Sequence, residues 1–106
     1  MPEPLPTTPA LPPLRGAQRR WLRAQAHGLR PVVQVGERGL SEPVLCALDQ
    51  ALLDHELVKV RLRSPEDKKA TARELAARSR AELCGLVGHT VILYRRHPES
   101  PRLQLP

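Results

Sequence analysis

The segment Gly36-Glu37-Arg38-Gly39 combines residue types and a spacing that suit contact with phosphate groups. Glycine has no Cβ, so the backbone on either side of it can approach a phosphate chain closely. A helix that begins just after the segment would add a partial positive charge at its N-terminus. The carboxylate of Glu37 repels phosphate, so we expect Arg38 to face the anion. The segment therefore predicts a contact with the backbone of a nucleic acid.

Spacing alone does not identify this loop, because Gly85-Leu86-Val87-Gly88 repeats it. The second copy has an apolar centre and lies in an expected strand that leads into a tight turn, so we interpret it as structural. Residues 36–39 differ in context: a strand is expected before them, a helix capped by Ser41 after them, and basic residues nearby. KH domains use such a loop to clamp about four nucleotides. A plain strand-to-helix turn remains the alternative interpretation.

Basic side chains outside the loop can supply the attraction that glycines cannot. The chain has 17 Lys and Arg against 11 Asp and Glu, which gives a net charge of +6 and favours a polyanionic partner. Any one of these side chains could be ordinary solvated surface, and we expect that of Lys68 and Lys69, which alternate with acids. As a set, we expect an electrostatic footprint made of Arg19, Arg20, Arg23, Arg30, Lys59, Arg61 and Arg63, with Arg95 and Arg96 as an extension.

Other classes of function find little support in the sequence. Trp21 and Tyr94 are the only aromatic residues, too few for a sheet that stacks bases on exposed rings. Cys46 and Cys84 are far apart in sequence, and we expect two free thiols in the cytoplasm. No apolar run approaches the roughly 20 residues of a membrane span. No metal-ligand spacing or catalytic motif is evident, so we expect no enzyme activity, no cofactor, no metal and no small-molecule substrate.

Hydrophobic periodicity predicts the elements that must position the loop. We expect helices and strands to alternate and to end in a hairpin with a two-residue turn at Gly88-His89. The third helix should begin at a cap formed by Ser64, with Pro65 in its first position. The expected helices cover residues 14–27, 41–55 and 64–80, and the expected strands 31–35, 57–63, 83–87 and 90–95.

This order predicts an α/β fold, helix-strand-helix-strand-helix-strand-strand, with a mixed four-stranded sheet. In the strand over 57–63, apolar residues alternate with basic ones, so one face should be apolar and the other wholly basic. We expect a proline-rich disordered tail over 1–13, one monomeric domain over 14–96 and a C-terminal extension over 97–106.

Four separated blocks, together spanning about residues 14 to 96, resemble the CRM domain of the YhbY family. They are Gln18 to Arg23 with Ala26 to Gly36, Gly39-Leu40, His55 to Val60, and Gly88 to Arg95. The resemblance implies a fold similar to the C-terminal domain of bacterial translation initiation factor 3. It also implies that the RNA contact is the glycine loop, here Gly36, Glu37, Arg38 and Gly39. The chain departs from the family pattern at Arg15, where a Ser or Thr cap is common, at Arg80, where Gly is common, and at Cys84-Gly85, which replace bulkier strand residues.

The resemblance also implies a partner, because stand-alone bacterial members of the family associate with precursors of the large ribosomal subunit. We therefore expect an RNA-binding assembly factor that binds large-subunit ribosomal RNA or its precursor particle. Plant organelle relatives assist group II intron splicing, so a splicing cofactor is one alternative. A module that docks on a ribosomal or other protein, with its charge serving solubility, is the other.

Overall fold

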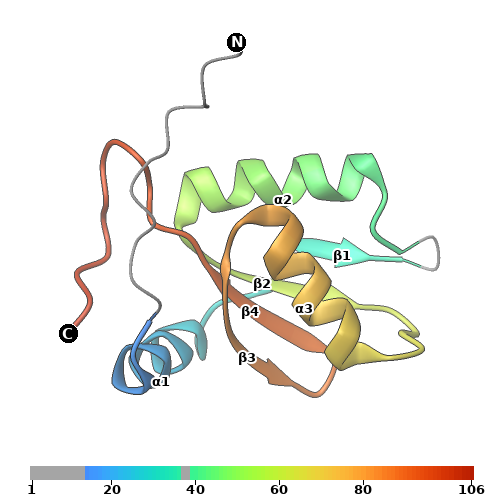
Figure 1. The fold of residues 1–106 in the computed structure, drawn as a ribbon, viewed down its shortest axis with the longest axis horizontal. Coiled ribbons are helices and arrows are strands. Elements are labelled where there is room, and N and C mark those ends of the chain that lie inside the picture. Colours follow the sequence, from blue (N-terminus) through green and yellow to red (C-terminus); the bar gives the residue numbers. More distant parts are fainter. Residues whose placement is uncertain (1–13, 37–38) are drawn as a thin grey trace, which may run out of the picture.

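The computed structural model describes residues 14–36 and 39–106, and this part of the chain forms three helices and four strands in the predicted order (Figure 1). The proline-rich segment 1–13 lies outside the described residues. The elements are α1 (Gly16–Ala26), β1 (Val33–Val35), α2 (Glu42–His55), β2 (Leu57–Leu62), α3 (Lys68–Ser79), β3 (Glu82–Val87) and β4 (Thr90–Tyr94). The predicted α/β fold is confirmed.

The four strands form one mixed sheet in the order β1-β2-β4-β3. Strand β1 runs parallel to β2, and β4 runs antiparallel to both β2 and β3. The parallel pair is joined by α2 as a crossover, and the hairpin closes through Gly88, which has the positive φ of +59° that such a tight turn needs. Strand β3 is thereby left at one edge of the sheet.

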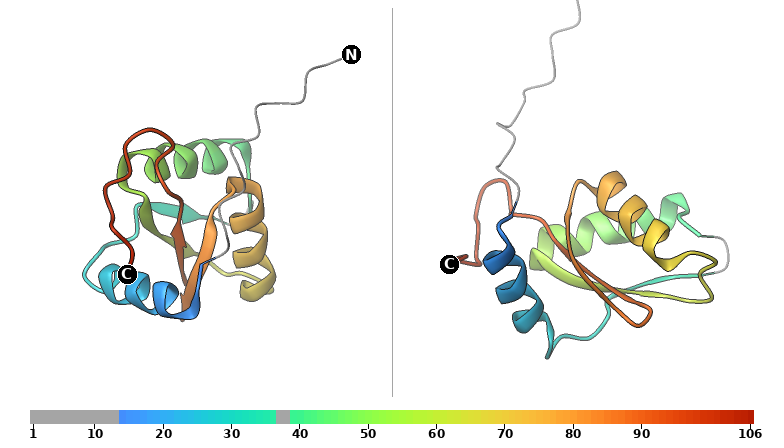
Figure 2. Two further views of the ribbon diagram at one scale, coloured as in Figure 1. Left: turned by 60° about the vertical axis from the view of Figure 1, so that its left-hand side comes forward. Right: turned by 60° about the horizontal axis from the view of Figure 1, so that its bottom comes forward.

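The helices cover the two faces of the sheet unequally (Figure 2). Helices α2 and α3 lie together on one face and α1 lies on the other, so the sheet separates two apolar clusters. The larger cluster joins Leu48 and Leu52 of α2 to Leu75 of α3, Val60 and Leu93. The smaller one joins α1 to one half of the opposite face, through Leu22, Ala26, Leu57, Cys84, Ile92 and Tyr94.

The third helix begins later than predicted, and the Ser64 cap is wrong. Asp67 is the N-cap, and its Oδ1 accepts a hydrogen bond of 3.1 Å from the N–H of Ala70. Ser64 has a φ of +50°, which is incompatible with the extended backbone of an N-cap. The turn out of β2 thus takes up the first residues that the sequence pattern assigns to the helix.

The last ten residues have no helix or strand, yet they pack back on the domain beside α1 (Figure 1). Leu103 and Leu105 join the smaller apolar cluster. The fully buried carboxylate of Glu56 accepts hydrogen bonds from the backbone N–H groups of His97, Arg102 and Leu103, at 3.0, 2.6 and 3.0 Å. Three fixed donors on one buried charge hold this segment in place.

Candidate nucleic-acid interface

The glycine loop leaves β1 and enters α2, as the sequence predicts. Glu37 and Arg38 lie outside the described residues. The N–H of Gly39 donates to the carbonyl of Gly36 at 3.0 Å, and Gly39 has a φ of +69°, which an L side chain adopts only with strain. A Cβ on Gly36 would meet no atom within 4 Å, and the φ of Gly36 is not positive. Glycine is therefore required by the backbone at position 39 and not by the described packing at position 36.

The start of α2 offers few free donors to an anion. Ser41 is its N-cap, as predicted, and its Oγ accepts from the N–H of Val44 at 3.5 Å. Pro43 has no N–H, and the carboxylate of Glu42 occupies the first turn. Attraction by the helix N-terminus is therefore weaker than the sequence suggested, and positive side chains must supply most of it.

Two cross-strand rows organise the face of the sheet that carries α1. The first row joins Gly85, Ile92 and Lys59, and α1 covers it in part. The second row joins Val87, Thr90, Arg61 and Gln34. Rows two residues apart along a strand are about 7 Å apart, so the second row lies one step nearer to the glycine loop. The smaller apolar cluster holds no residue of this row, and Arg61, Gln34 and Val87 are exposed.

Arg63 connects this open row to the loop. Its backbone N–H donates to the carbonyl of Val35 at 2.9 Å, one residue before Gly36. Its side chain is exposed, as is that of Arg61. Alternate residues of β2 point to the same face, so Lys59, Arg61 and Arg63 share one face, as predicted. The face is not wholly basic, because Leu57 also lies on it and is buried in the smaller apolar cluster. We call Arg61, Arg63 and the loop residues Gly36 and Gly39 the open basic end of the sheet.

Three of the predicted contact residues are engaged within the protein. Arg23 Nη1 donates to the carbonyl of Cys84 at 2.8 Å, and Arg19 Nη2 lies 3.4 Å from Glu82 Oε2. Lys59 Nζ donates to the carbonyls of Leu29 and His27, at 3.1 and 3.4 Å. Arg23 and Lys59 still border the open basic end through the first row. Within the protein, these contacts of Arg19, Arg23 and Lys59 attach α1 and the segment that follows it to the sheet.

Arg20 and Arg30 are exposed but lie away from the open basic end. Arg20 is on α1. Arg30 lines an apolar hollow of about 390 Å³ with Val32 and Leu57, at the opposite end of β2 from Arg63. The structure therefore brings Arg61, Arg63 and the loop together, and it does not bring Arg30 to them.

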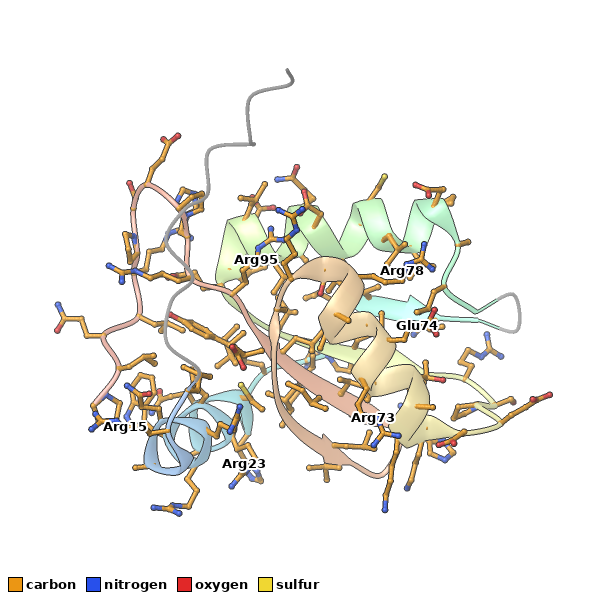
Figure 3. All side chains as sticks on the ribbon, in the orientation of Figure 1. Arg15, Arg23, Arg73, Glu74, Arg78 and Arg95 are labelled. Atoms are coloured by element: carbon orange, nitrogen blue, oxygen red, sulfur yellow. The ribbon has the colours of Figure 1, made fainter. Side chains whose placement is uncertain are left out.

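Arg95 has a structural role instead of extending the footprint. Its Nη1 donates to Asp49 Oδ1 at 2.8 Å and to the carbonyl of Ser79 at 2.9 Å. The side chain thereby joins α2 to the end of α3 (Figure 3).

Gln34 and Thr90, which flank Arg61 in the second row, were missed by the sequence reasoning. Only the register between the strands shows that these residues are neighbours of Arg61, and the alternation of side chains along one strand does not reveal the register.

Over 14–36 and 39–106, no group of three or more His, Cys, Asp or Glu side chains is placed to hold a metal ion. Within these ranges no helix combines the length and the apolar character that crossing a bilayer requires.

Comparison with known proteins identifies the family of the chain. Residues 14–95 match the CRS1/YhbY (CRM) domain. The chain is 37% identical over 95 residues to the Probable RNA-binding protein YqeI of Bacillus subtilis, which covers 88% of this chain and 99% of that protein. It is 42% identical over 84 residues to the Probable RNA-binding protein PA4753 of Pseudomonas aeruginosa, with 77% and 81% covered.

A solved structure is similar as well. The solution structure of the hypothetical protein SAV1595 from Staphylococcus aureus superposes with a TM-score of 0.77 at 35% sequence identity, and covers 88% of this chain and 99% of that one. The fold, the loop between β1 and α2 and the match over residues 14–95 are mutually consistent. The chain belongs to the CRS1/YhbY (CRM) domain family.

Proposed function

We propose that this protein binds RNA through the open basic end of the sheet, and that its target is ribosomal RNA in precursors of the large ribosomal subunit. The observation that carries the proposal is the position of Arg61 and Arg63. Both side chains are exposed, and the backbone of Arg63 is hydrogen-bonded to the residue that precedes the loop. Relatives named as RNA-binding proteins, at 37% and 42% identity, support the choice of RNA.

The mode of contact follows from the side chains that are available. Arginine can bind a phosphate through two parallel N–H groups, and Gly36 leaves space for a backbone to approach. Within the described part of the chain, Tyr94 is buried and Trp21 packs against the smaller apolar cluster, so stacking on aromatic rings contributes little. Backbone contacts of this kind position an RNA and read little of its sequence. The selectivity for a ribosomal precursor would then come from RNA shape.

The binding test compares two double variants of equal charge. Arg61→Gln with Arg63→Gln removes two charges at the open basic end, and Arg78→Gln with Arg80→Gln removes two charges on and just after α3. We expect the first pair to weaken binding of a labelled ribosomal RNA fragment at least about tenfold, because a charge-assisted contact contributes on the order of 1–3 kcal/mol. The control pair should bind like the unaltered protein. Equal binding by all three folded proteins would contradict the proposed interface.

The ribosomal target needs a separate test in cells. Sucrose-gradient fractionation should place the protein with a large-subunit precursor, and the Arg61 and Arg63 double variant should shift toward the free-protein fractions. A profile confined to free-protein fractions for the unaltered protein would refute the ribosomal target. A complex that survives complete nuclease treatment would favour docking on a protein instead.

A further inference from the structure

A groove on the opposite face of the sheet has the features of a second anion site. It lies between α3 and the edge strand β3 and has a volume of about 320 Å³. Its apolar floor consists of the buried Ala72 and the half-buried Leu83 and Leu86. Its rim consists of three positively charged side chains, Lys68, Lys69 and Arg73. We call this feature the α3–β3 groove.

The positive charges of the groove have no acidic partner among residues 14–36 and 39–106, where the ion pairs involve other residues. None of the acids nearest in sequence, Glu66, Asp67 and Glu74, forms an ion pair with them. Asp67 caps α3, and Glu74 pairs with Arg78 at 3.7 Å on another side of the helix from Arg73 (Figure 3). The sequence places Lys68 and Lys69 among acids, but the fold does not bring those acids to them.

The arrangement of these charges opposes helix stability. Lys68 and Lys69 occupy the first two positions of α3, whose first turn has no acid, although positive charge there is disfavoured by the helix dipole. Lys69 and Arg73 are four residues apart, where like charges repel. The carboxylate of Asp67 at the N-cap offsets part of the first penalty, and no described ion pair offsets the second. Residues that break local rules are expected at functional sites. An anionic ligand would remove both penalties.

The groove and the open basic end lie on opposite faces of the sheet, and a path around its edge passes β3 and then β4, which lies between β3 and β2. Leu86 lines the groove on one face of the sheet, and the next residue, Val87, lies on the other face in the row of Arg61. Consecutive strand residues point to opposite faces. Val87 is 66% exposed, so the edge strand is open to solvent at this residue. A chain that crosses this edge of β3 would reach both sites.

We infer that the α3–β3 groove binds the phosphodiester backbone of a second segment of the same RNA, with Lys69 and Arg73 on the phosphates and the apolar floor against the sugars. This inference rests on the proposed function and extends its footprint around the edge strand. A linear polyanion fits better than a free phosphate ion, because the positive side chains that line the groove are spread along α3 from Lys68 to Arg73.

The test uses the double variant Lys69→Gln with Arg73→Gln. The control is the double variant Arg78→Gln with Arg80→Gln, which loses the same number of charges from the other end of α3. Lys, Arg and Gln have similar helix propensities, and thermal unfolding would check that both variants fold. The probe is a labelled RNA hairpin with single-stranded flanks, titrated at several salt concentrations. We expect the groove variant to bind at least about tenfold more weakly, with a salt slope reduced by roughly 1.4–1.8 for two lost phosphate contacts. The control should keep the slope of the unaltered protein.

The outcomes distinguish failure of the groove inference from failure of RNA binding as such. If the unaltered protein does not bind the hairpin, both fail. If it binds, and the groove variant keeps the full affinity and salt slope, the groove inference alone is refuted. Equal losses in the groove and control variants would also refute it, since net charge would then be the cause. Polyglutamate that binds the unaltered protein more tightly than RNA, and not the groove variant, would assign the groove to an acidic protein segment. Shifts of the Leu83 and Leu86 methyl resonances on RNA addition would give direct support.

Discussion

The side-chain stem of Arg23 occupies the space that a side chain on Gly85 would need. A Cβ built on Gly85 would lie 2.7 Å from Cδ of Arg23, and the guanidinium of the same arginine donates to the carbonyl of Cys84 at 2.8 Å. Glycine at this position of the edge strand therefore lets α1 attach to β3. This packing explains the glycine at position 85, one of the two positions at which Cys84-Gly85 departs from the family pattern.

Gly85→Ala should displace Arg23 and break its hydrogen bond to Cys84. We expect the free energy of unfolding to fall by about 1–2 kcal/mol, because a part-buried, charge-assisted hydrogen bond is lost. Urea unfolding would measure the change. Gly28→Ala is the matched control, since a Cβ there meets no atom within 4 Å. Equal stability of the two variants would mean that Arg23 moves aside at no cost.

The two loop glycines should separate the needs of the fold from those of the ligand. Gly36→Ala should leave the free energy of unfolding within about 0.5 kcal/mol, and it should weaken RNA binding severalfold if a phosphate chain approaches the backbone there. Gly39→Ala should cost about 1 kcal/mol in stability because of its positive φ. Urea unfolding and RNA titration of both variants would test this. Unchanged binding by Gly36→Ala would exclude close approach at that residue.

Arg80→Gly should stabilise the protein. Arg80 ends α3 in the left-handed conformation, with a φ of +58° and a ψ of +34°. That conformation costs an L residue roughly 1–2 kcal/mol, and part of the gain is offset by the greater freedom of glycine in the unfolded chain. We expect a net increase of about 0.5–1 kcal/mol by thermal or urea unfolding. Arg78→Gly, in the last turn of α3, should instead destabilise by about 1 kcal/mol.

Glu56 should make stability depend on acid pH. Burial raises the pKa of this carboxyl, but the N–H groups of His97, Arg102 and Leu103, with the charge of Arg102, outweigh burial and hold the pKa below its ordinary value of 4.5. The unfolded chain therefore binds the proton more readily. The stabilisation is complete above the ordinary pKa and is lost as the pH falls through the lower pKa of the folded protein.

Glu56→Gln should accordingly reduce the free energy of unfolding by about 1–3 kcal/mol near neutral pH. The difference from the unaltered protein should shrink as the pH falls below about 4.5, because Glu56 then takes up a proton, whereas Gln is uncharged at every pH. Urea unfolding across this pH range measures both effects. A difference that stayed constant with pH would show that the charge of Glu56 is not what holds residues 97–106.

The two cysteines should react at very different rates. Cys46 is exposed, whereas Cys84 is 2% exposed. Burial raises the pKa of the Cys84 thiol to about 11, with Arg19 and Arg23 opposing the shift and Glu82 adding to it. Thiolate is the reactive form, so iodoacetamide should modify Cys46 in the folded protein and Cys84 only after unfolding. Mass spectrometry of a Cys46→Ser variant would test this, since single modification of that folded variant would contradict it.

The element order, the mixed sheet and the basic face of β2 were predictable because each depends on local patterns. Alternating residues determine the face of β2, and Ser41 with Pro43 marks the start of α2. The start of α3 was not predictable from Ser64, because a serine followed by proline fits a cap and a turn equally well. The positive φ of Ser64 decides between them, and the sequence alone does not reveal it.

The candidate site was only partly predictable, because it depends on contacts between distant residues. The alternation of β2 places Lys59 and Arg61 on one face, but only the fold shows that Lys59 is engaged by the carbonyls of His27 and Leu29. Arg23 likewise donates a hydrogen bond to the carbonyl of Cys84 in β3, which is 61 residues away in sequence. The pairing of Gln34 and Thr90 with Arg61 depends on register, and the separation of Lys68 from its neighbouring acids depends on how the turn after β2 folds.

The anchored C-terminal segment determines where a label can be attached. The carbonyl of Pro106 accepts hydrogen bonds from Gln18 Nε2 at 3.2 Å and Arg15 Nη2 at 3.4 Å, at the start of α1. Figure 1 shows this end of the chain on the opposite side of the domain from the end of β1 and the start of α2. A fluorophore or immobilisation tag joined at residue 106 would therefore report on RNA binding without obstructing either proposed contact surface.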